Sequence, residues 1–349
     1  MKSRAFVQRA VLSVDEKLAS VSRWLHREQG TILSFLIHSL FASEEEAQCG
    51  LLDPQQGFTV AMLREFLAYF MREGFRFLSP RDLAEDLSPG GKYILLTFDD
   101  GYFNNTRALP LLEEFNVPAA FFISSGHVKQ GKAFWWDALY RESGKRGRFA
   151  EEVRHKAAIY KQMAPLQIEA DICSRFGRLA LSPVGDLDRP FTPSELAKFA
   201  SHPLVFLGNH TRDHAILTNC FSEEIRSQIL DCQESLCEMT GKSPEIIAYP
   251  NGNCSREIGE AASGAGLLFG LLARPGRNLL PLQGGTSRAM TMKRFTLWGD
   301  RPVEAQCRAS RSPLSLYRVL QGMAWKPKPS QPNLVSIRKE KPLARSASS

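Results

Sequence analysis

The clearest indication of the fold is the stretch Lys92-Tyr-Ile-Leu-Leu-Thr-Phe98, which is followed directly by Asp99-Asp100-Gly101-Tyr102. Its first seven residues are mostly apolar and β-prone, which predicts a strand buried on both faces, as in a parallel sheet. The glycine permits a sharp turn that presents both carboxylates to one cavity. Two adjacent carboxylates are costly to ionise together unless a cation lies beside them. An ordinary Asp-Asp-Gly turn is the competing interpretation.

The segments on either side of this strand alternate between β-prone and helix-favouring sequence. Strands are predicted over residues 31–38, 119–123, 204–207, 245–249 and 267–272, and helices over 59–72, 106–114, from 192, 222–239 and 255–264. Repeated β/α alternation predicts an α/β protein with a parallel barrel or an open parallel sheet. In either architecture the catalytic residues lie at the carboxyl ends of the strands.

Three segments stand outside this alternation. Residues 1–28 carry apolar side chains at helical spacing, which predicts an amphipathic helix that packs on the main domain or lies on a membrane surface. Within the main domain, 29–300, residues 141–180 are charged and helix-favouring, and we interpret them as a helical insertion. Residues 301–349 are rich in Pro, Ser, Lys and Arg, which predicts a basic, disordered tail.

The charge of the chain is concentrated in that tail. The 349 residues carry a formal net charge of +7, and residues 301–349, with ten basic and two acidic side chains, account for +8 of it. The remaining 300 residues are therefore close to neutral, at −1. This distribution gives no support to a nucleic-acid partner. Contact with an anionic membrane surface through the tail or the N-terminal helix stays open.

Composition also suggests a compartment. Charged residues interrupt every apolar core that a secretory signal peptide would need. The longest apolar stretches, 31–42 and 264–273, are shorter than the roughly 18–20 residues that span a bilayer. The seven cysteines form no CxxC pair, which favours free thiols in a reducing compartment. We expect a cytoplasmic protein, with a peripheral position at the inner membrane as the alternative.

Two histidines follow the predicted strand over 204–207. His210 and His214 stand four residues apart in His-Thr-Arg-Asp-His, and this spacing predicts two imidazoles on one face of a helical turn, where they can hold one metal ion. Two surface histidines are the competing interpretation. Combined with a carboxylate from a strand end, they would form a three-ligand site with an open position, the arrangement of a catalytic metal.

A third strand end carries Tyr249, Pro250 and Asn251, followed by Gly252. Such a turn could supply backbone N–H groups to an oxyanion, although it could equally be an ordinary turn.

The order of these three motifs resembles one family. TFDDGY, then HTxxH about a hundred residues later, then a strand ending in AYP-x-G is similar to the polysaccharide deacetylases, the NodB-homology or carbohydrate esterase family 4 proteins. The segments 108–112, 117–123 and 134–137 are also similar, and the resemblance covers residues 31–300. It implies a distorted (β/α) barrel and one divalent metal ion, often zinc, for the removal of N- or O-acetyl groups from sugars.

The resemblance also implies roles for single residues. Asp100, His210 and His214 would hold the metal, and Asp99 would be the general base that takes the proton as water attacks. The metal and the turn N–H groups would stabilise the tetrahedral oxyanion.

The sequence departs from the family at the general acid. Many members use a late histidine to protonate the leaving amine, but no histidine follows His214 here. Some members look circularly permuted, with this histidine in an N-terminal strand reading Leu-x-Tyr-His, and Phe35-Leu-Ile-His38 occupies that place. We therefore predict His38 as the general acid, with a satisfied core histidine as the alternative. The arginine that often orients the base is missing before Tyr249, and Arg294 is the candidate replacement.

Two tryptophans, Trp135 and Trp136, could stack on a sugar ring or pack in the core. The leading hypothesis is a metal-dependent hydrolase that removes an N-acetyl or O-acetyl group from a sugar of a polysaccharide or of a lipid-linked or nucleotide-linked glycan precursor. The alternatives are a deformylase or deacylase of a lipid-linked amino sugar and a non-catalytic sugar-binding relic. Retention of Asp99 argues against the relic, because the metal needs only the other three side chains.

Overall fold

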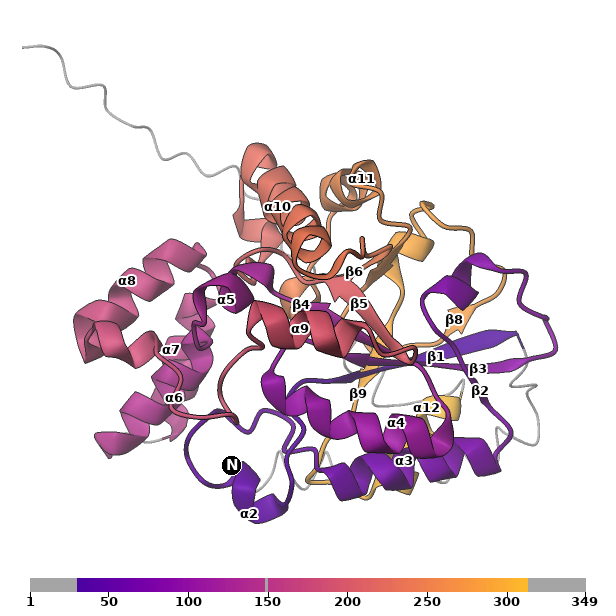
Figure 1. Cartoon of the computed structure of the whole chain (residues 1–349), viewed down its shortest axis with the longest axis horizontal. Helices are drawn as coiled ribbons and strands as arrows, with labels where there is room; N and C mark the ends of the chain where they lie inside the picture. Colours follow the sequence, from indigo (N-terminus) through magenta and orange to yellow (C-terminus); the bar gives the residue numbers. More distant parts are fainter. Residues whose placement is uncertain (1–29, 148–149, 313–349) are drawn as a thin grey trace, which may run out of the picture.

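The computed structural model describes residues 30–147 and 150–312 as one sheet surrounded by helices (Figure 1). The strands are β1 (Thr31–Ile37), β2 (Arg76–Phe77), β3 (Lys92–Phe98), β4 (Ala119–Ile123), β5 (Val205–Asn209), β6 (Ile246–Ala248), β7 (Phe269–Leu271), β8 (Asn278–Leu279) and β9 (Arg294–Thr296). The α-helices are α2 (Glu44–Ala47), α3 (Val60–Arg72), α4 (Leu109–Phe115), α5 (Ser125–Gln130), α6 (Trp135–Lys145), α7 (Ala150–Tyr160), α8 (Pro165–Phe176), α9 (Pro193–Ala200), α10 (Ser222–Thr240), α11 (Arg256–Gly264) and α12 (Val303–Arg311).

The sheet runs in the order β7-β6-β5-β4-β3-β1-β8, with β2 on β3 and β9 on β1. In the described ranges the β1–β8 pairing is antiparallel and the other strand pairings are parallel. The segment that leads into β9 curls the sheet on itself, because Met292 bridges to Leu271 of β7 just before β9 pairs with β1. The predicted distorted (β/α) barrel is confirmed in this nearly closed form, and the open sheet is not formed.

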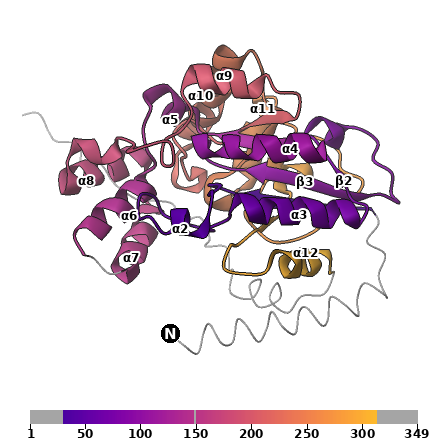
Figure 2. The ribbon, with the colours of Figure 1, turned by 60° about the horizontal axis from the view of Figure 1, so that its bottom comes forward.

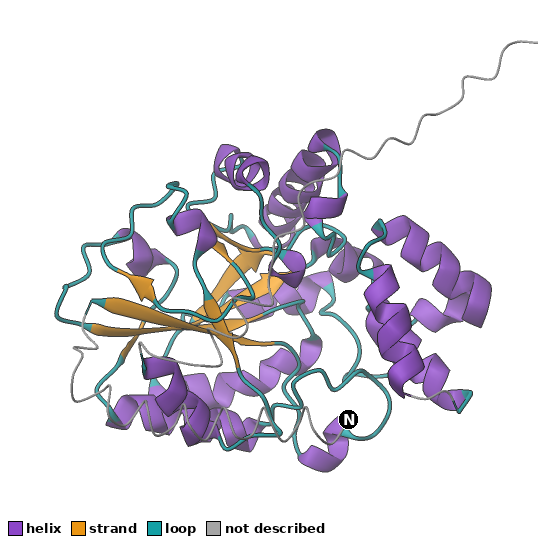
Figure 3. Cartoon of the chain, turned by 180° about the vertical axis from the view of Figure 1, so that it is seen from behind, coloured by secondary structure: helices purple, strands orange, loops and turns teal. Residues whose placement is uncertain are grey.

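Alternate residues of each strand face different layers, and both layers are apolar, which is why the central strands β1, β3 and β4 are mostly apolar. Ile94, Leu96 and Phe98 of β3 belong to the main core, which also contains buried residues of α3, α4 and α9. Tyr93 and Leu95 pack into the barrel interior. Figure 2 shows α3 and α4 side by side along one face, and Figure 3 shows the sheet in the middle of the molecule.

A lobe of helices, α6, α7 and α8, lies beside the barrel (Figures 1 and 3). It has its own apolar cluster, in which Leu139, Tyr160 and Ile172 are buried. The helical character predicted for residues 141–180 is confirmed, but the lobe begins earlier, at Trp135. At the start of α6, Trp135 contacts the lobe and Trp136 contacts the site. Because the two adjacent tryptophans pack in different directions, their sequence does not show the spacing that marks the start of a helix.

The domain continues past the boundary predicted at residue 300. α12 packs against α3 (Figure 2), with Val303 and Cys307 buried one helical turn apart. Arg311 donates to the Tyr69 hydroxyl at 2.7 Å and to Glu73 Oε2 at 2.6 Å. The prediction of a disordered tail from residue 301 is therefore wrong for this helix, because composition averaged over the whole tail hid its apolar i, i+4 pair. Residues 1–28 and 313–349, with the predicted N-terminal helix and most of the basic tail, lie outside the described residues.

Two further expectations concern cysteines and membranes. All seven cysteines lie in the described ranges and are free thiols, as predicted. Within those same ranges, no helix combines the length and the apolarity that crossing a membrane would require.

Candidate active site

The carboxyl ends of β1 and β3 lie level with each other. Ile37 pairs with Phe98, and the Asp99 N–H donates to the Ile37 carbonyl at 2.9 Å. His38 and Asp99 therefore leave the sheet together. Both continue the series of residues that faces the barrel interior, since side chains alternate with a period of two along a strand. The site begins where this interior series ends.

Asp100, His210 and His214 form the one group in the described residues in which three potential metal ligands converge. Their ligand atoms all lie within 4.8 Å of one another. Asp100 Oδ1 lies 3.3 Å from His210 Nε2 and 3.2 Å from His214 Nε2. The convergence that sequence spacing predicted is thus present.

The His210–His214 segment is a loop, so the predicted helical turn is wrong. Thr211 and His214 adopt φ angles of 61° and 52°, which a helix excludes. The conformation is held by the Thr211 N–H, which donates to Asn209 Oδ1 at 2.9 Å, and by the Thr211 hydroxyl, which accepts from the Ala215 N–H at 2.9 Å. Two left-handed residues bring the imidazoles together without a helix.

Left-handed backbone conformations gather at this site. Besides the two residues of that loop, Asp100 (φ 76°), Asn251 (φ 58°) and Gln55 (φ 46°) are left-handed and line the same cavity. Such conformations are costly for residues other than glycine, and they concentrate where function maintains them. The clustering marks this end of the barrel independently of the motifs.

The donor set of this group fits a divalent metal ion. Both carboxylate oxygens of Asp100 are buried and have no hydrogen-bond partner. His210 Nδ1 lies 2.7 Å from the Ala248 carbonyl, which can only accept, so Nδ1 carries the proton and Nε2 is directed at the carboxylate. Burial lowers the pKa of His214, which favours the neutral imidazole that coordination requires. A cation among these atoms would satisfy all of them.

Charge at the site favours ionised carboxylates. Burial raises the pKa of Asp100, but the imidazoles of His38, His210 and His214 hold that pKa well below its ordinary value. Burial likewise lowers the pKa of His210, and the carboxylates of Asp99 and Asp100 more than offset it, so that pKa is raised.

Arg294 holds Asp99 with both arms of its guanidinium. Nη1 donates to Asp99 Oδ1 at 2.6 Å and Nη2 donates to Oδ2 at 2.8 Å. A further bond joins Nη1 to Thr97 Oγ1 at 3.0 Å, and the arginine is fully buried. Burial raises the pKa of Asp99, and the Arg294 charge, with a smaller contribution from His210, brings it below its ordinary value. Bidentate contact fixes the orientation of the carboxylate as well as its charge.

His38 lies in the same cavity as Asp99 and Asp100. Its backbone is held by Gln56 Oε1, which accepts from the His38 N–H at 2.9 Å, and by Asn105 Nδ2, which donates to its carbonyl at 2.7 Å. Its ring atom Nδ1 is buried and has no hydrogen-bond partner. The alternative of a satisfied core histidine is therefore not what the structure has.

The turn after β6 has fewer free backbone N–H groups for an oxyanion than the sequence predicts. The Tyr249 hydroxyl donates to the Met290 carbonyl at 3.1 Å, and its N–H donates to Leu271 at 3.1 Å. Pro250 has no N–H. Asn251, which lines the cavity, is the residue of this turn whose N–H forms no backbone hydrogen bond with the other described residues.

The two tryptophans differ in their surroundings. Trp136 is buried, lies edge-on to the His214 ring at 4.6 Å, and donates from Nε1 to the Tyr102 hydroxyl at 2.8 Å. Trp135 is half-buried, lines the cavity and packs edge-on to Tyr160 of the lobe. Both tryptophans line the cavity, but Trp136 is buried against a ligand histidine, whereas Trp135 is the more exposed of the two.

Sequence reasoning missed a buried polar chain next to this site. The Tyr102 hydroxyl donates to Asp137 Oδ2 at 2.6 Å, and Asp137 Oδ1 accepts from the Asp53 N–H at 3.0 Å. The chain joins the β3 loop, the lobe and the loop that carries Gln55 and Gln56. The similarity of residues 134–137 to the family was the one available signal, and it assigned no partner to Asp137.

The metal-binding group, Asp99, His38, Trp135 and Asn251 line one cavity of about 660 Å³, whereas Arg294, Tyr102 and Asp137 lie behind its wall. At one side it is lined by the metal-binding group, Asp99 and His38, and at the other by residues of the helical lobe. A parallel barrel with polar side chains at the carboxyl ends of its strands, around an Asp-His-His group, defines the class of barrel enzymes.

The comparisons place the chain within that class. The family model for polysaccharide deacetylase matches residues 86–270, more than half of the chain, so the chain belongs to the polysaccharide deacetylase family. Members of this family are carbohydrate deacetylases, hydrolases that act on carbon–nitrogen bonds other than peptide bonds.

Individual relatives are distant. "Putative polysaccharide deacetylase YxkH" of Bacillus subtilis is 20% identical over 274 residues, which cover 77% of this chain and 74% of that protein. Streptococcus pyogenes deacetylase PplD, solved in complex with acetate, superposes with a TM-score of 0.55 at 16% identity, over 81% of this chain and 99% of that one. The polysaccharide deacetylase BC0361 of Bacillus cereus gives a TM-score of 0.56 at 16% identity, over 81% of this chain and 69% of that one. At this identity the structures establish the shared fold.

Proposed function

We propose that this protein is a metal-dependent hydrolase that removes an N-acetyl group from an amino sugar of a glycan or glycan precursor. The observation that carries the proposal is the meeting of the Asp100-His210-His214 group with an Asp99 that Arg294 holds in place, in a single cavity. A divalent cation held by the three residues, which we propose to be Zn²⁺, would supply Lewis acidity for cleavage of the amide.

The chain's own residues supply the proton transfers. Asp99 is ionised and faces the cavity, so it accepts the proton of the attacking water. Arg294 keeps that carboxylate in one orientation. His38, on the neighbouring strand end and with a ring Nδ1 that bonds to none of the described residues, donates a proton to the leaving amine. Base and acid thus come from adjacent strands.

Two further contacts complete the proposed site. The Asn251 N–H is directed at no carbonyl of the described chain, and we assign it to the oxyanion. Trp135 lines the cavity beside the lobe and provides an apolar face for a sugar ring. Tyr249, whose polar groups are already bonded, and Trp136, which packs on His214, act by support.

The contacts that hold Asp99 disfavour the alternative of a non-catalytic sugar-binding relic. A protein that only bound a sugar would not need a buried arginine dedicated to orienting a carboxylate that is not among the three converging ligands. Formyl and other small acyl groups are the alternative substrates, and the experiment below distinguishes them from acetyl.

The test is acyl release by metal-loaded protein. We expect acetate from N-acetylated amino sugars, and loss of that release together with loss of stoichiometric zinc in His210→Ala. His38→Ala keeps its zinc and loses about 10²-fold in kcat, the size of a general-acid contribution. Release that survives both His210→Ala and Asp99→Asn would overturn the proposal. Formate without acetate would move the assignment to a deformylase.

A further inference from the structure

One face of α7 looks into the active-site cavity. Arg154, Ala157, Ala158 and Lys161 all line the cavity, and they occupy positions i, i+3, i+4 and i+7. Residues at this spacing share one face of a helix. Lys161 directly follows the last residue of α7, and its N–H donates to the Ala157 carbonyl at 3.0 Å, so it continues the helical spacing. This face therefore presents two cations to the cavity, about 10 Å apart along the helix axis, with two of the smallest side chains between them.

These two cations have no acidic partner, unlike their neighbours. Lys156 of α7 pairs with Asp171 of α8 at 2.9 Å, and Lys132 pairs at 2.6 Å with Glu169, which lines the cavity. For Arg154 and Lys161 there is no ion pair among the described residues. Both side chains are exposed and line the cavity, so their positive charges are available to an anionic ligand.

Apolar side chains continue the wall beyond the cations. Met163, Pro165, Ile168 and Leu181 line the same cavity. The lobe thus offers both cationic and apolar side chains to the cavity, and the neighbouring loop, which bonds to α6 through the Asp53 N–H, adds Asp53, Gln55 and Gln56. The cavity's volume, about 660 Å³, is ample for a ligand larger than one sugar.

We propose that the α7 face binds a phosphate or diphosphate group linked to the amino sugar, and that the apolar side chains of the lobe receive what lies beyond the phosphate. The inference rests on the proposed deacylation of an amino sugar and specifies its substrate class. The alanines leave room for the phosphate to approach the helix, and the long side chains of Arg154 and Lys161 reach it from both sides. A lipid chain and a nucleoside are the two sources of such a phosphate.

The test compares four N-acetyl amino sugars with parent enzyme and Arg154→Gln/Lys161→Gln. These are a neutral methyl glycoside, the sugar 1-phosphate, a nucleoside-diphosphate-linked sugar, and a polyprenyl-phosphate-linked sugar in detergent. We expect the parent to prefer phosphate-linked sugars, and the double variant to reduce that preference about tenfold through KM, as two partly solvated ion pairs would. The better of the lipid-linked and nucleoside-linked substrates identifies the source.

Two controls separate the possible failures. Arg178→Gln removes an exposed cation of the same lobe that does not line the cavity, and it should leave the preference as in the parent. Calorimetric binding of the sugar 1-phosphate to metal-free protein should weaken about tenfold in the double variant, independently of catalysis. No acyl release from any substrate would overturn the proposed function. Equal kcat/KM for neutral and phosphate-linked sugars, or equal phosphate binding by parent and double variant, would overturn this inference.

Discussion

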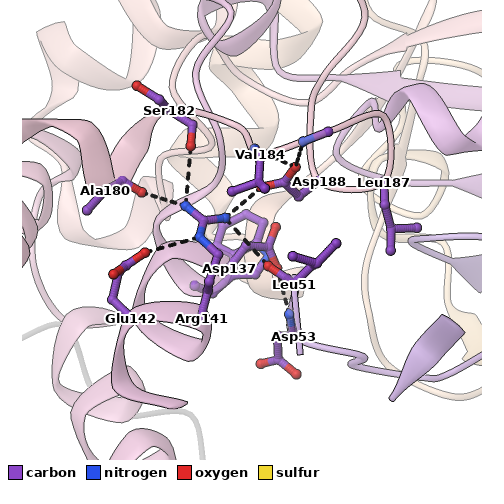
Figure 4. Close-up of polar contacts among 12 residues, drawn as sticks. Leu51, Asp53, Asp137, Arg141, Glu142, Ala180, Ser182, Val184, Leu187 and Asp188 are labelled. Carbon is purple, nitrogen blue, oxygen red and sulfur yellow. Dashed lines mark hydrogen bonds and ion pairs between the residues drawn. The ribbon is translucent and has the colours of Figure 1, made fainter. Parts of the chain in front are cut away.

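Two buried arginine–aspartate pairs occupy different parts of the molecule and are built differently. At the barrel end, Arg294 donates to both oxygens of Asp99, at 2.6 and 2.8 Å. Beside the lobe, Arg141 donates to a single oxygen of Asp188 at 2.6 Å (Figure 4). Asp188 is otherwise bonded to backbone N–H groups of residues 184–185, at 2.9 to 3.1 Å.

The surroundings separate the two roles. Arg141 also donates to the Ala180 carbonyl of the lobe at 2.8 Å and to the Leu51 carbonyl at 3.5 Å, so this pair fastens the lobe to the Leu51 loop and to the segment that carries Asp188. Neither member lines the cavity, whereas Asp99 does. An arginine–aspartate pair can therefore serve two purposes. Arg141–Asp188, which backbone groups enclose, holds segments together, whereas Arg294–Asp99, whose carboxylate borders the cavity, is part of the candidate active site.

The largest effect is expected at the barrel end of this comparison. Asp99→Asn removes the proposed base, so kcat should fall about 10²–10⁴-fold. The matched change Asp188→Asn should leave kcat per folded molecule near that of the parent, because Asp188 does not line the cavity. Steady-state acetate release, normalised to folded protein by circular dichroism, measures both. Equal losses in the two variants would remove the distinction.

The second effect is on stability and belongs to the lobe. Arg141→Met leaves Asp188 as an unpaired buried charge, which costs about 3–5 kcal/mol of unfolding free energy. Urea unfolding and a fall in Tm of roughly 10 °C would register it. A loss below about 1 kcal/mol would show that the backbone N–H groups alone hold the carboxylate.

A smaller effect is expected when Arg294 of the barrel pair is replaced. Without the Arg294 charge, burial raises the pKa of Asp99, so the acid limb of the pH–rate profile should move to higher pH in Arg294→Gln. Activity is then lost at a higher pH as the solution is acidified. We expect kcat to fall about 10–100-fold as well, as for other positioning contacts.

Arg294→Lys serves as the control for that change. It keeps the charge but not the two-armed contact, so its limb should stay closer to that of the parent while kcat still falls. A limb that does not move in Arg294→Gln would mean that the limb reports another group.

The smallest effect concerns Asp137, which connects the two regions. Burial raises the pKa of this carboxyl well above its ordinary value, against the hydrogen bond from Tyr102. A raised folded-state pKa gives stability that is present below the unfolded pKa and lost as pH rises towards the folded one. Asp137→Asn should thus cost about 1 kcal/mol at pH 5 and less at pH 8, measured by urea unfolding. A cost that grows with pH would contradict this.

How much of the site could be predicted from the sequence depended on how far apart along the chain the contacting residues lie. β3 was predicted with its exact bounds because its apolar run and the Asp-Asp-Gly turn are local features. His38 was found through a resemblance, since nothing local says that β1 lies beside β3. Arg294 was only a candidate, because it reaches Asp99 across 195 positions once β9 closes the barrel. The α7 face was not foreseen, as its charges look like an ordinary solvated helix.

Sequence alone determined the alternation of strands and helices, the two aspartates at a strand end, and the pair of histidines four residues apart. Each is set by local patterning, in which apolar periodicity and turn residues act over a few positions. Tertiary structure decided that the histidine motif is a left-handed loop, that Arg294 holds Asp99, and that a helical lobe brings to the cavity two cations without an acidic partner among the described residues. These depend on closure of the barrel and packing of distant segments, where burial and charge are properties of neighbours that the chain brings together only on folding.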